Sequence, residues 1–332
     1  MITLDIFSGD AFRLAAMTAA INAQPYVPGM IGASGLFESG GIMTSTASIE
    51  LLNGTLSLVQ TTARGAPGIS VSADRREMTS FVVPHLQVND RIYADEVLNL
   101  RAFGSDSELS TVQSVVEARL AKARRNIDAT HEWHRVGALK GIVYDADGTT
   151  VLANLFTAFG VSQSTQNVAL SNSATKLRNV FTATARTIED ALGNANYTGL
   201  VAWCGATFWD SLIEHASVKE TYLNQSAAND LRGNPLNSFD FGGITWNRYR
   251  GKNGSTPYIA DTKAYIVPTG VPDLFITRFA PGDYVETVNT IGLPYYARQT
   301  LMQNGKGIDI EAQSNPLHIC TRPAAIVEAT AT

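Results

Sequence analysis

The sequence predicts an α+β fold in which helical and β-rich segments occupy separate stretches of the chain. One very long amphipathic helix precedes a shorter helical block, and the last third is rich in strand-like segments. Strands and helices do not alternate as they do in doubly wound enzymes. Hydrophobic residues make up 45% and charged residues 17% of the 332 residues, which indicates an ordered globular protein with room for one elaborated domain or two modest ones.

The first forty residues have the character of an arm rather than of a compact domain. Asp10 is predicted to cap a short helix that runs from Ala11 to about Asn22. Four residues are predicted to form its apolar face: Phe12, Ala15, Ala16 and Ala19. Prolines and glycines then disfavour regular structure over residues 24–42, although apolar residues continue through this stretch. Two interpretations carry equal weight: a loop packed on its own domain, or an arm that lies on a neighbouring subunit.

A long β excursion is predicted next. Strand-like segments flank Asn53 and Gly54, a dipeptide that favours tight hairpins because both turn residues need positive φ. Further strands are predicted at 69–72 and 79–88, and Pro84 makes the second of these an edge or bulged strand. A two-stranded ribbon is not stable alone, so the excursion must pack on something else.

The clearest helix begins near a cap at Ser105 or Ser107 and continues to Leu139, before Gly141. Its length of roughly thirty residues corresponds to about 45 Å. Apolar residues recur along it at spacings of three and four: Leu109, Val112, Val116, Leu120, Ala123 and Ile127.

Four basic residues lie on this helix: Arg119, Lys122, Arg124 and Arg125. We interpret them as a solvated face with acidic partners such as Glu117 and Asp128. The alternative is a contact with nucleic acid or with another subunit.

After the long helix, a hairpin is predicted to turn at Asp147 and Gly148. An amphipathic helix follows and ends at Gly193, with five residues facing inward: Leu177, Phe181, Ala185, Ile188 and Leu192. Residues 198–205 are predicted to form a strand buried on both faces, and helices are predicted at 206–215 and 217–225. The remainder is predicted to be β-rich.

No residue pattern predicts catalysis, a metal site or a bound cofactor. His131 and His134 are three residues apart, whereas the zinc-binding H-E-x-x-H helix requires four, so we interpret them as a polar patch. Asp145 and Asp147 open like a calcium loop, but the later ligands are missing, and a hairpin turn suffices. The nucleophile elbow, the phosphate loop and the strand-linked G-x-G-x-x-G are missing too. We therefore expect a protein that is not an enzyme.

Charge, cysteine content and the N-terminus limit the possible partners and the cellular compartment. The net charge of -5 does not favour tight nucleic-acid binding. Cys204 and Cys320 fit no disulfide framework, so we interpret them as buried free thiols. The N-terminus lacks the basic region of a signal peptide, and the apolar stretch at 12–21 is too short to span a bilayer. We expect a protein made in a reducing cytoplasm, with no membrane partner.

The order of these elements resembles the tailed-phage major capsid fold, and more narrowly the lambda-like major capsid protein E family. The resemblance is carried by residues 75–104, 199–223 and 273–329, and the last of these includes the run I-x-I-x-x-Q-S-N-P-L. It implies a virion protein whose hexamers and pentamers form an icosahedral shell around double-stranded DNA, assembled in the host cytoplasm. It also implies four parts: an N-terminal arm at 1–40, an extended two-stranded loop at 41–100, a peripheral domain at 101–167 and 274–332 with a spine helix at 109–140, and an axial domain at 168–273.

Two departures from some relatives narrow this expectation. Some carry a fused scaffolding segment before the arm; here the arm begins at once, so a separate scaffolding protein is expected beside a portal protein. Others seal the shell with an isopeptide bond from a lysine in the extended loop, but the first lysine of this chain is Lys122. We therefore expect a shell without covalent crosslinks, with a decoration protein at threefold positions as a further candidate partner.

Arg64, Arg75 and Arg76 are the candidate intersubunit residues of the extended loop. A guanidinium suits this role because it can bind a carboxylate through two parallel hydrogen bonds. Solvated charges at a loop tip are the equal alternative. For the chain as a whole, an encapsulin-like nanocompartment shell is the alternative function, and an uncharacterised hydrolase is the outsider.

Overall fold

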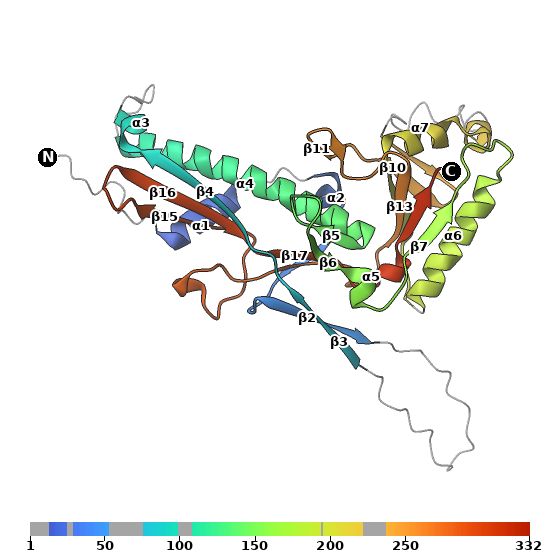
Figure 1. Ribbon diagram of the computed structural model, residues 1–332, viewed down its shortest axis with the longest axis horizontal. Coiled ribbons are helices and arrows are strands. Elements are labelled where there is room, and N and C mark those ends of the chain that lie inside the picture. The colour runs from blue at the N-terminus through green and yellow to red at the C-terminus, as the bar shows by residue number, and fades with distance from the viewer. Residues whose placement is uncertain (1–12, 25–28, 53–75, 99–107, 194, 222–236) are drawn as a thin grey trace, which may run out of the picture. The chain divides into compact units, whose positions relative to one another are not determined.

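The computed structural model describes residues 13–24, 29–52, 76–98, 108–193, 195–221 and 237–332 (Figure 1). The chain divides into two compact units. Unit 1 comprises Met1–Ala47, Val82–His134 and Ile276–His318, and unit 2 comprises Ser48–Phe81, Arg135–Phe275 and Ile319–Thr332. Helices combine with sheets that contain both parallel and antiparallel strand pairs, so the predicted α+β class is confirmed. Between residues 151 and 241 helices and strands alternate, which departs from the separate blocks expected from the sequence.

Unit 1 contains an antiparallel sheet in the order β15-β16-β4. Its strands are β15 (Tyr296–Leu301), β16 (Gly307–Ser314) and β4 (Leu86–Tyr93). Because side chains alternate across a strand, Ile308 and Ile310 point to one face and Asp309 and Glu311 to the other. The apolar face packs against α1 (Leu14–Ala23) and α4 (Glu108–Lys140), which together with the sheet form the core of this unit.

The long helix α4 has 33 residues, which confirms the long helix predicted from the apolar spacing (Figure 1). The face predicted from the spacing is the buried one within unit 1, where Val116, Leu120 and Ile127 are each at most 3% exposed. The helix ends at Gly141, whose φ of 83° favours glycine because a side chain there would be strained.

The predicted face of the N-terminal helix is wrong. The buried residues of α1 are Met17, Thr18 and Ile21, whereas Ala15 and Ala19 are exposed. Met17 and Ile21 remove far more apolar surface from water than alanines do, and this decides which face turns inward. The predicted cap Asp10 and the predicted contact Phe12 lie outside the described residues.

The stretch at 29–41 is more regular than its glycines suggested. It contains a short helix, α2 (Met30–Ala33), with Ile31 fully buried, and a strand, β1 (Glu38–Gly41). Strand β1 pairs in parallel with β14 (Phe275–Phe279) in a second sheet, β1-β14-β17, whose third strand is Pro316–Cys320. The described part of the arm therefore packs on its own unit, the first of the two interpretations.

The single strand predicted at 79–88 is divided in two. Strand β3 (Arg76–Val82) lies beside β2 (Thr46–Leu52), whereas β4 begins at Leu86 and joins the sheet of unit 1. Pro84 sits in the break, because it cannot donate to a strand ladder and its φ is fixed. The predicted hairpin at Asn53 and Gly54 and the strand at 69–72 lie outside the described residues.

Unit 2 is built on a six-stranded sheet in the order β7-β18-β13-β8-β10-β9 among the residues described. Its strands are β7 (Ser164–Asn167), β18 (Val327–Thr330), β13 (Lys263–Thr269), β8 (Gly199–Cys204), β10 (Ile244–Arg248) and β9 (Ser238–Phe241). The inner strand β13 is buried along nearly its whole length, as expected for the middle of a covered sheet.

One face of this sheet is covered by α6 (Leu177–Leu192) and α7 (Ala206–Glu214). The inward face predicted for α6 is confirmed, with Phe181 and Ile188 fully buried and only Ala185 partly exposed. Trp246 of β10 lies at the centre of this core and donates its indole N–H to the Phe241 carbonyl at 3.0 Å. Both cysteines are free and buried, as predicted.

Smaller elements complete the described chain. They are α3 (Ala94–Leu98), β5 (Ile142–Tyr144), β6 (Val151–Asn154), α5 (Leu155–Ala158), a helical stretch at 216–221, β11 (Lys252–Asn253), β12 (Thr256–Pro257), the 3-10 turn η3 (Val285–Thr287) and a second 3-10 turn at Pro323–Ala325. Within the described ranges, no helix combines the length and apolar character needed to cross a membrane.

Candidate intersubunit surface

Three of the five histidines lie close together in the interior of unit 1. His131, His134 and His318 are each at most 1% exposed, and the ring of His318 lies 5.4 Å from that of His131 and 6.4 Å from that of His134. One nitrogen of His131 lies 3.0 Å from the Ser314 hydroxyl, and one of His318 lies 2.8 Å from the Thr277 hydroxyl. The predicted polar patch is therefore part of the interior of unit 1. Among the described residues, no three His, Cys, Asp or Glu side chains could hold a metal ion.

The acidic pair at 145–147 forms a turn, as predicted. Asp147 accepts hydrogen bonds from the backbone N–H groups of Thr149 and Thr150, both at 2.9 Å, and from the Thr150 hydroxyl at 2.6 Å. These bonds, that of the Thr150 hydroxyl above all, lower the pKa of Asp147 well below its ordinary value. Gly148, with φ of 72°, completes the β5–β6 hairpin.

The basic segment of α4 divides into two kinds of residue. Lys122 and Arg125 are exposed, and Arg119 pairs with Glu96 at 2.9 Å and with Asp90 at 3.4 Å, in line with the predicted solvated face.

Arg124 is the exception, because it is only 6% exposed. It lies four residues after Leu120 and three before Ile127, so the helical spacing itself places it on the buried face. Arg124 donates to the backbone carbonyls of Ile21 and Gln24, and its guanidinium lies 3.8 Å from the Asp128 carboxylate. It therefore fixes the C-terminal end of α1 to the long helix.

Glu132 holds the next part of the arm. Its buried carboxylate accepts hydrogen bonds from the backbone N–H of Ile31 at 2.8 Å and from that of Gly32 at 3.0 Å. These donors lie at the start of α2, where backbone N–H groups lack partners within the helix. A Cβ added at Gly29 would lie 2.1 Å from Cδ of Glu132, so the approach of the two segments requires glycine.

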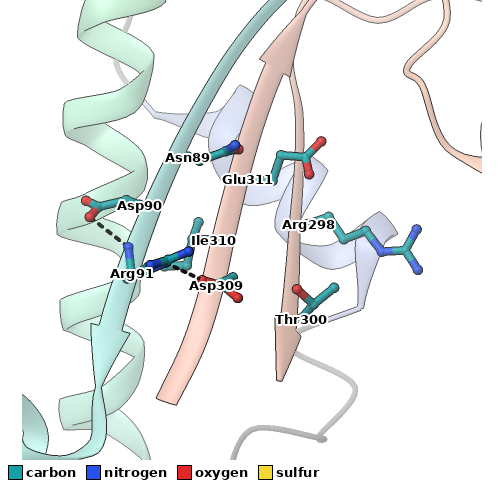
Figure 2. Close-up of a pocket in the computed structure, with 8 residues that line it drawn as sticks. All are labelled: Asn89, Asp90, Arg91, Arg298, Thr300, Asp309, Ile310 and Glu311. Carbon is teal, nitrogen blue, oxygen red and sulfur yellow. Dashed lines mark hydrogen bonds and ion pairs between the residues drawn. The ribbon is translucent and has the colours of Figure 1, made fainter. Parts of the chain in front are cut away.

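The outer face of the sheet β15-β16-β4 carries a ladder of polar side chains (Figure 2). Arg298 lies opposite Glu311 in the register, and Arg91 lies opposite Asp309, with which it forms an ion pair of 3.0 Å. A shallow depression of about 590 Å³ opens between them. Eight residues line it: Asn89, Asp90, Arg91, Arg298, Thr300, Asp309, Ile310 and Glu311. Opposite charges are paired across neighbouring strands, so this surface carries no strong net charge.

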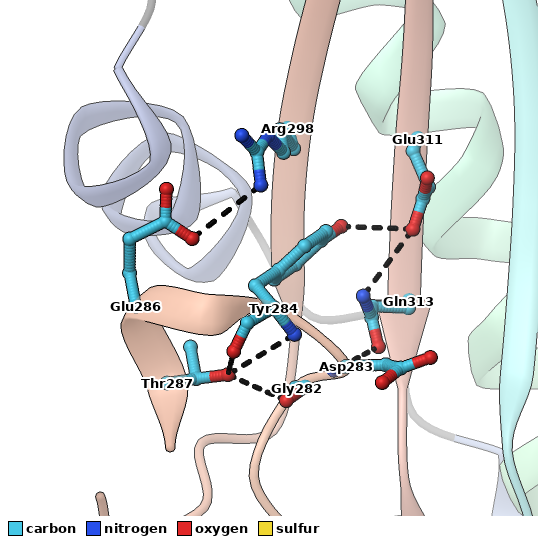
Figure 3. Close-up of polar contacts among 8 residues, drawn as sticks. All are labelled: Gly282, Asp283, Tyr284, Glu286, Thr287, Arg298, Glu311 and Gln313. Atoms are coloured by element: carbon cyan, nitrogen blue, oxygen red, sulfur yellow. Dashed lines mark hydrogen bonds and ion pairs between the residues drawn. The ribbon is translucent and has the colours of Figure 1, made fainter.

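Beside this ladder, Tyr284 joins the sheet to the connection between β14 and β15 (Figure 3). Its hydroxyl donates to Glu311 at 3.1 Å, and the Arg298 guanidinium lies 5.4 Å from the centre of its ring. Burial raises the pKa of Tyr284, and the neighbouring Glu311 carboxylate raises it further. The phenol therefore stays protonated and keeps its donor role.

Four large apolar residues of the same connection face solvent. Val285 is 87% exposed, Val288 65%, Ile291 61% and Leu293 44%. We refer to residues 285–293 as the apolar loop. A cluster of exposed apolar side chains on one short segment marks an interaction site more often than isolated exposed residues do.

The side chains of the three predicted intersubunit arginines lie outside the described part of the structure. Arg64 and Arg75 lie outside the described residues. Arg76 is the first residue of β3, and its side chain also lies outside them. Their intersubunit role remains a prediction.

The fold of the chain is that of phage capsid proteins. A prophage protein of E. coli CFT073 shares it with a TM-score of 0.59 at 13% identity, covering 96% of this chain and 99% of that one. The capsid protein of Myoviridae phage XM1 gives a TM-score of 0.51 at 11% identity, covering 93% and 94%.

Comparison with known families matches residues 13–331 to the phage major capsid protein E family. The chain belongs to that family, which comprises structural capsid proteins rather than enzymes. It is 26% identical to the major capsid protein of Salmonella phage Felix O1 over 355 aligned residues, covering 96% of both chains. It is 25% identical to the major capsid protein of Pseudomonas phage KPP10, covering 96% of this chain and 97% of that protein. The predicted family and the predicted capsid fold are confirmed.

Proposed function

We propose that this chain forms the hexamers and pentamers of an icosahedral shell that encloses double-stranded DNA. The observation that carries the proposal is the family match, which extends over residues 13–331. The net charge of -5 is compatible with enclosure of DNA without sequence-specific binding.

Electron microscopy of the purified product, expressed with and without a co-expressed scaffolding protein, tests this proposal. Closed shells support it. The nucleic-acid content of shells recovered from infected cells separates a virion from a nanocompartment: double-stranded DNA supports the virion, and enzyme cargo without DNA supports the encapsulin-like alternative.

The contacts between copies are proposed to involve the extended loop at 41–100 and the axial domain at 168–273. In the described part of that loop, β2 and β3 form a two-stranded sheet with Ser48 and Ser80 exposed. Phe81 of β3 packs against Phe159 within unit 2, and the exposed side of the strand pair is proposed to lie on an adjacent subunit. The peripheral domain, at 101–167 and 274–332, is proposed to carry the spine helix.

Arg64, Arg75 and Arg76 are proposed to form ion pairs with carboxylates of the adjacent subunit. Reversing the charge of Arg75 and Arg76 together should lower the yield of procapsids, because attraction across the interface would become repulsion. An unchanged yield would contradict the role. The reversal of Lys122 and Arg125, which are exposed on α4 and lie outside both the extended loop and the axial domain, provides the control.

The shell is proposed to be free of covalent crosslinks. The first lysine of the sequence is Lys122, so the extended loop offers no amine for an isopeptide bond. Virions boiled in SDS should release the chain as a monomer. A ladder of covalent capsid multimers would refute this part of the proposal.

The proposed partners follow from the shell. They are a separate scaffolding protein, a portal protein and, at threefold positions, a decoration protein, with assembly in the host cytoplasm. Purification of assembly intermediates under mild conditions tests the set, since a capsid chain that forms closed shells entirely alone would remove the need for a separate scaffold.

A further inference from the structure

The apolar loop at 285–293 exposes four large apolar side chains on one short segment. Val285 and Val288 are 87% and 65% exposed, although buried valines are abundant elsewhere in both units. Leaving such side chains in water forgoes the free energy that burial would supply. We therefore expect that these exposed side chains of a capsid-family chain are covered by a binding partner.

Hydrogen bonds hold the start of the loop in place (Figure 3). The Thr287 hydroxyl donates to the carbonyl of Tyr284 at 2.9 Å and accepts from the Tyr284 N–H at 3.3 Å. The Asp283 N–H donates to the Gln313 side chain at 3.0 Å, and the Leu293 N–H donates to the Tyr296 hydroxyl at 2.9 Å.

Further bonds close the loop at its far end. The Thr290 hydroxyl donates to the Thr287 carbonyl at 2.7 Å, and the Gly292 N–H donates to the Ile42 carbonyl at 2.9 Å. The apolar side chains are thus presented by a fixed backbone, and a preorganised surface loses little conformational entropy when it is bound.

A cavity of about 650 Å³ lies next to the exposed valines. Its apolar lining includes Leu14 of α1 together with Ile291 and Leu293 of the loop itself. The same segment therefore offers a projection, at Val285 and Val288, and a recess that fits an apolar side chain.

The rim of this surface carries both signs of charge. Arg13 and Arg298 line the recess together with Glu286, and Glu286 pairs with Arg298 at 3.4 Å in a solvent-exposed position. A surface with both signs matches a partner that also has both signs, whereas DNA or an anionic membrane would meet Glu286 with like charge. A surface with its own projection and its own recess complements itself around a rotation axis.

We propose that the apolar loop is a self-contact, in which Val285 and Val288 of one copy enter the recess beside Ile291 and Leu293 of the next copy around a rotation axis. The occupant is a second copy of this chain. The inference rests on the proposed function, because it assigns a specific surface to the assembly that the family implies.

Crosslinking inside assembled shells tests the contact. The Val288→Cys variant is assembled and treated with a short bis-maleimide, and Val151→Cys is the matched control because Val151 is a 50% exposed valine on β6. The natural thiols do not interfere, because Cys204 and Cys320 are fully buried and burial raises the pKa of each. Each chain then has one reactive thiol, so the expected result is covalent dimers from Val288→Cys and monomer alone from Val151→Cys.

A second pair of variants measures assembly itself. Val288→Asp should keep the thermal midpoint of the wild type, since the residue is exposed, but should lower the shell yield by at least about tenfold, because a carboxylate would be buried in the contact. Val151→Asp should assemble like the wild type. If Val288→Asp does not fold, the crosslinking result decides.

The experiments distinguish failure of the proposed self-contact from failure of the proposed function. If wild-type chain forms shells but Val288→Cys shells yield only monomer, or if Val151→Cys gives the same yield of dimer, the self-contact is overturned and the proposed function stands. If the wild type forms no shells even with a scaffolding protein, the proposed function is overturned first.

Discussion

The contact between Glu132 and the start of α2 allows a quantitative test of how the N-terminal segment is held. Replacing Glu132 with alanine removes two hydrogen bonds from backbone N–H groups to a buried carboxylate. Hydrogen bonds to charged groups contribute about 1.5–3 kcal/mol each, so the loss is about 3 kcal/mol or more for opening of residues 29–33. At about 1.4 kcal/mol per factor of ten, amide exchange there should accelerate by roughly a hundredfold.

Gly29→Ala should have nearly the same effect by a different route. Gly29 has φ of -66°, which alanine adopts without strain, so the cost comes from displacing the Glu132 carboxylate that lies 2.1 Å from the new Cβ. In the Glu132→Ala background that obstacle is gone. The double variant should therefore exchange no faster than Glu132→Ala alone, which is a coupling of about 2–3 kcal/mol.

Hydrogen exchange with mass spectrometry, on the peptide that contains Ile31 and Gly32, measures these effects. Glu117→Ala is the control, because Glu117 is an exposed glutamate on the same helix and should leave the peptide unchanged. Two outcomes would show that Glu132 does not hold the start of α2: the effects of Glu132→Ala and Gly29→Ala on the exchange rate add fully, or Glu132→Ala leaves the exchange rate unchanged.

Two further predictions concern the cores. Cys204 and Cys320 should react with a thiol reagent only after unfolding, because burial raises the pKa of both thiols and that of Cys320 to about 12. Since the thiols of the unfolded chain ionise at lower pH, the free energy of unfolding should also fall as the pH rises from the ordinary thiol pKa toward 12. A thiol that reacts in the native protein would contradict this prediction. Trp246→Ala should destabilise unit 2 by about 3–5 kcal/mol in urea unfolding, because the indole is fully buried. The control Val151→Ala should change the free energy of unfolding by no more than about 0.5 kcal/mol, because Val151 is half exposed. Equal effects of the two substitutions would contradict the assigned core.

The helices were predictable because their signals are local. Residues 109–140 and 177–192 show apolar side chains at spacings of three and four over many turns, and no tertiary contact opposes that pattern. The β5–β6 hairpin was predictable for the same reason, since Asp147 and Gly148 supply the turn chemistry within four residues.

Other features depend on contacts between distant parts of the sequence. Strand β1 finds its partner in Ile276–Phe279, and nothing in the glycine-rich stretch at 38–41 indicates that pairing. The face of α1 was misjudged because the choice between its alanines and Met17 depends on what the helix packs against. Arg124 is different, because its position between Leu120 and Ile127 was a local signal of burial that its charge concealed.

The sequence predicted the class of protein but not the residues of the candidate contact surface. The order of elements indicated a capsid subunit, but the apolar loop has no sequence motif: its valines and isoleucine look like core residues until the structure shows them exposed. Exposure is a property of the folded surface, so it could not be deduced from composition or spacing.

Sedimentation velocity of the purified chain, measured with and without a scaffolding protein, shows whether the chain assembles with copies of itself. We expect material that sediments as capsomers or as closed shells, with the chain recovered as a monomer only after denaturation. A compact, stable monomer under both conditions would contradict the claim that this chain is built to assemble with copies of itself.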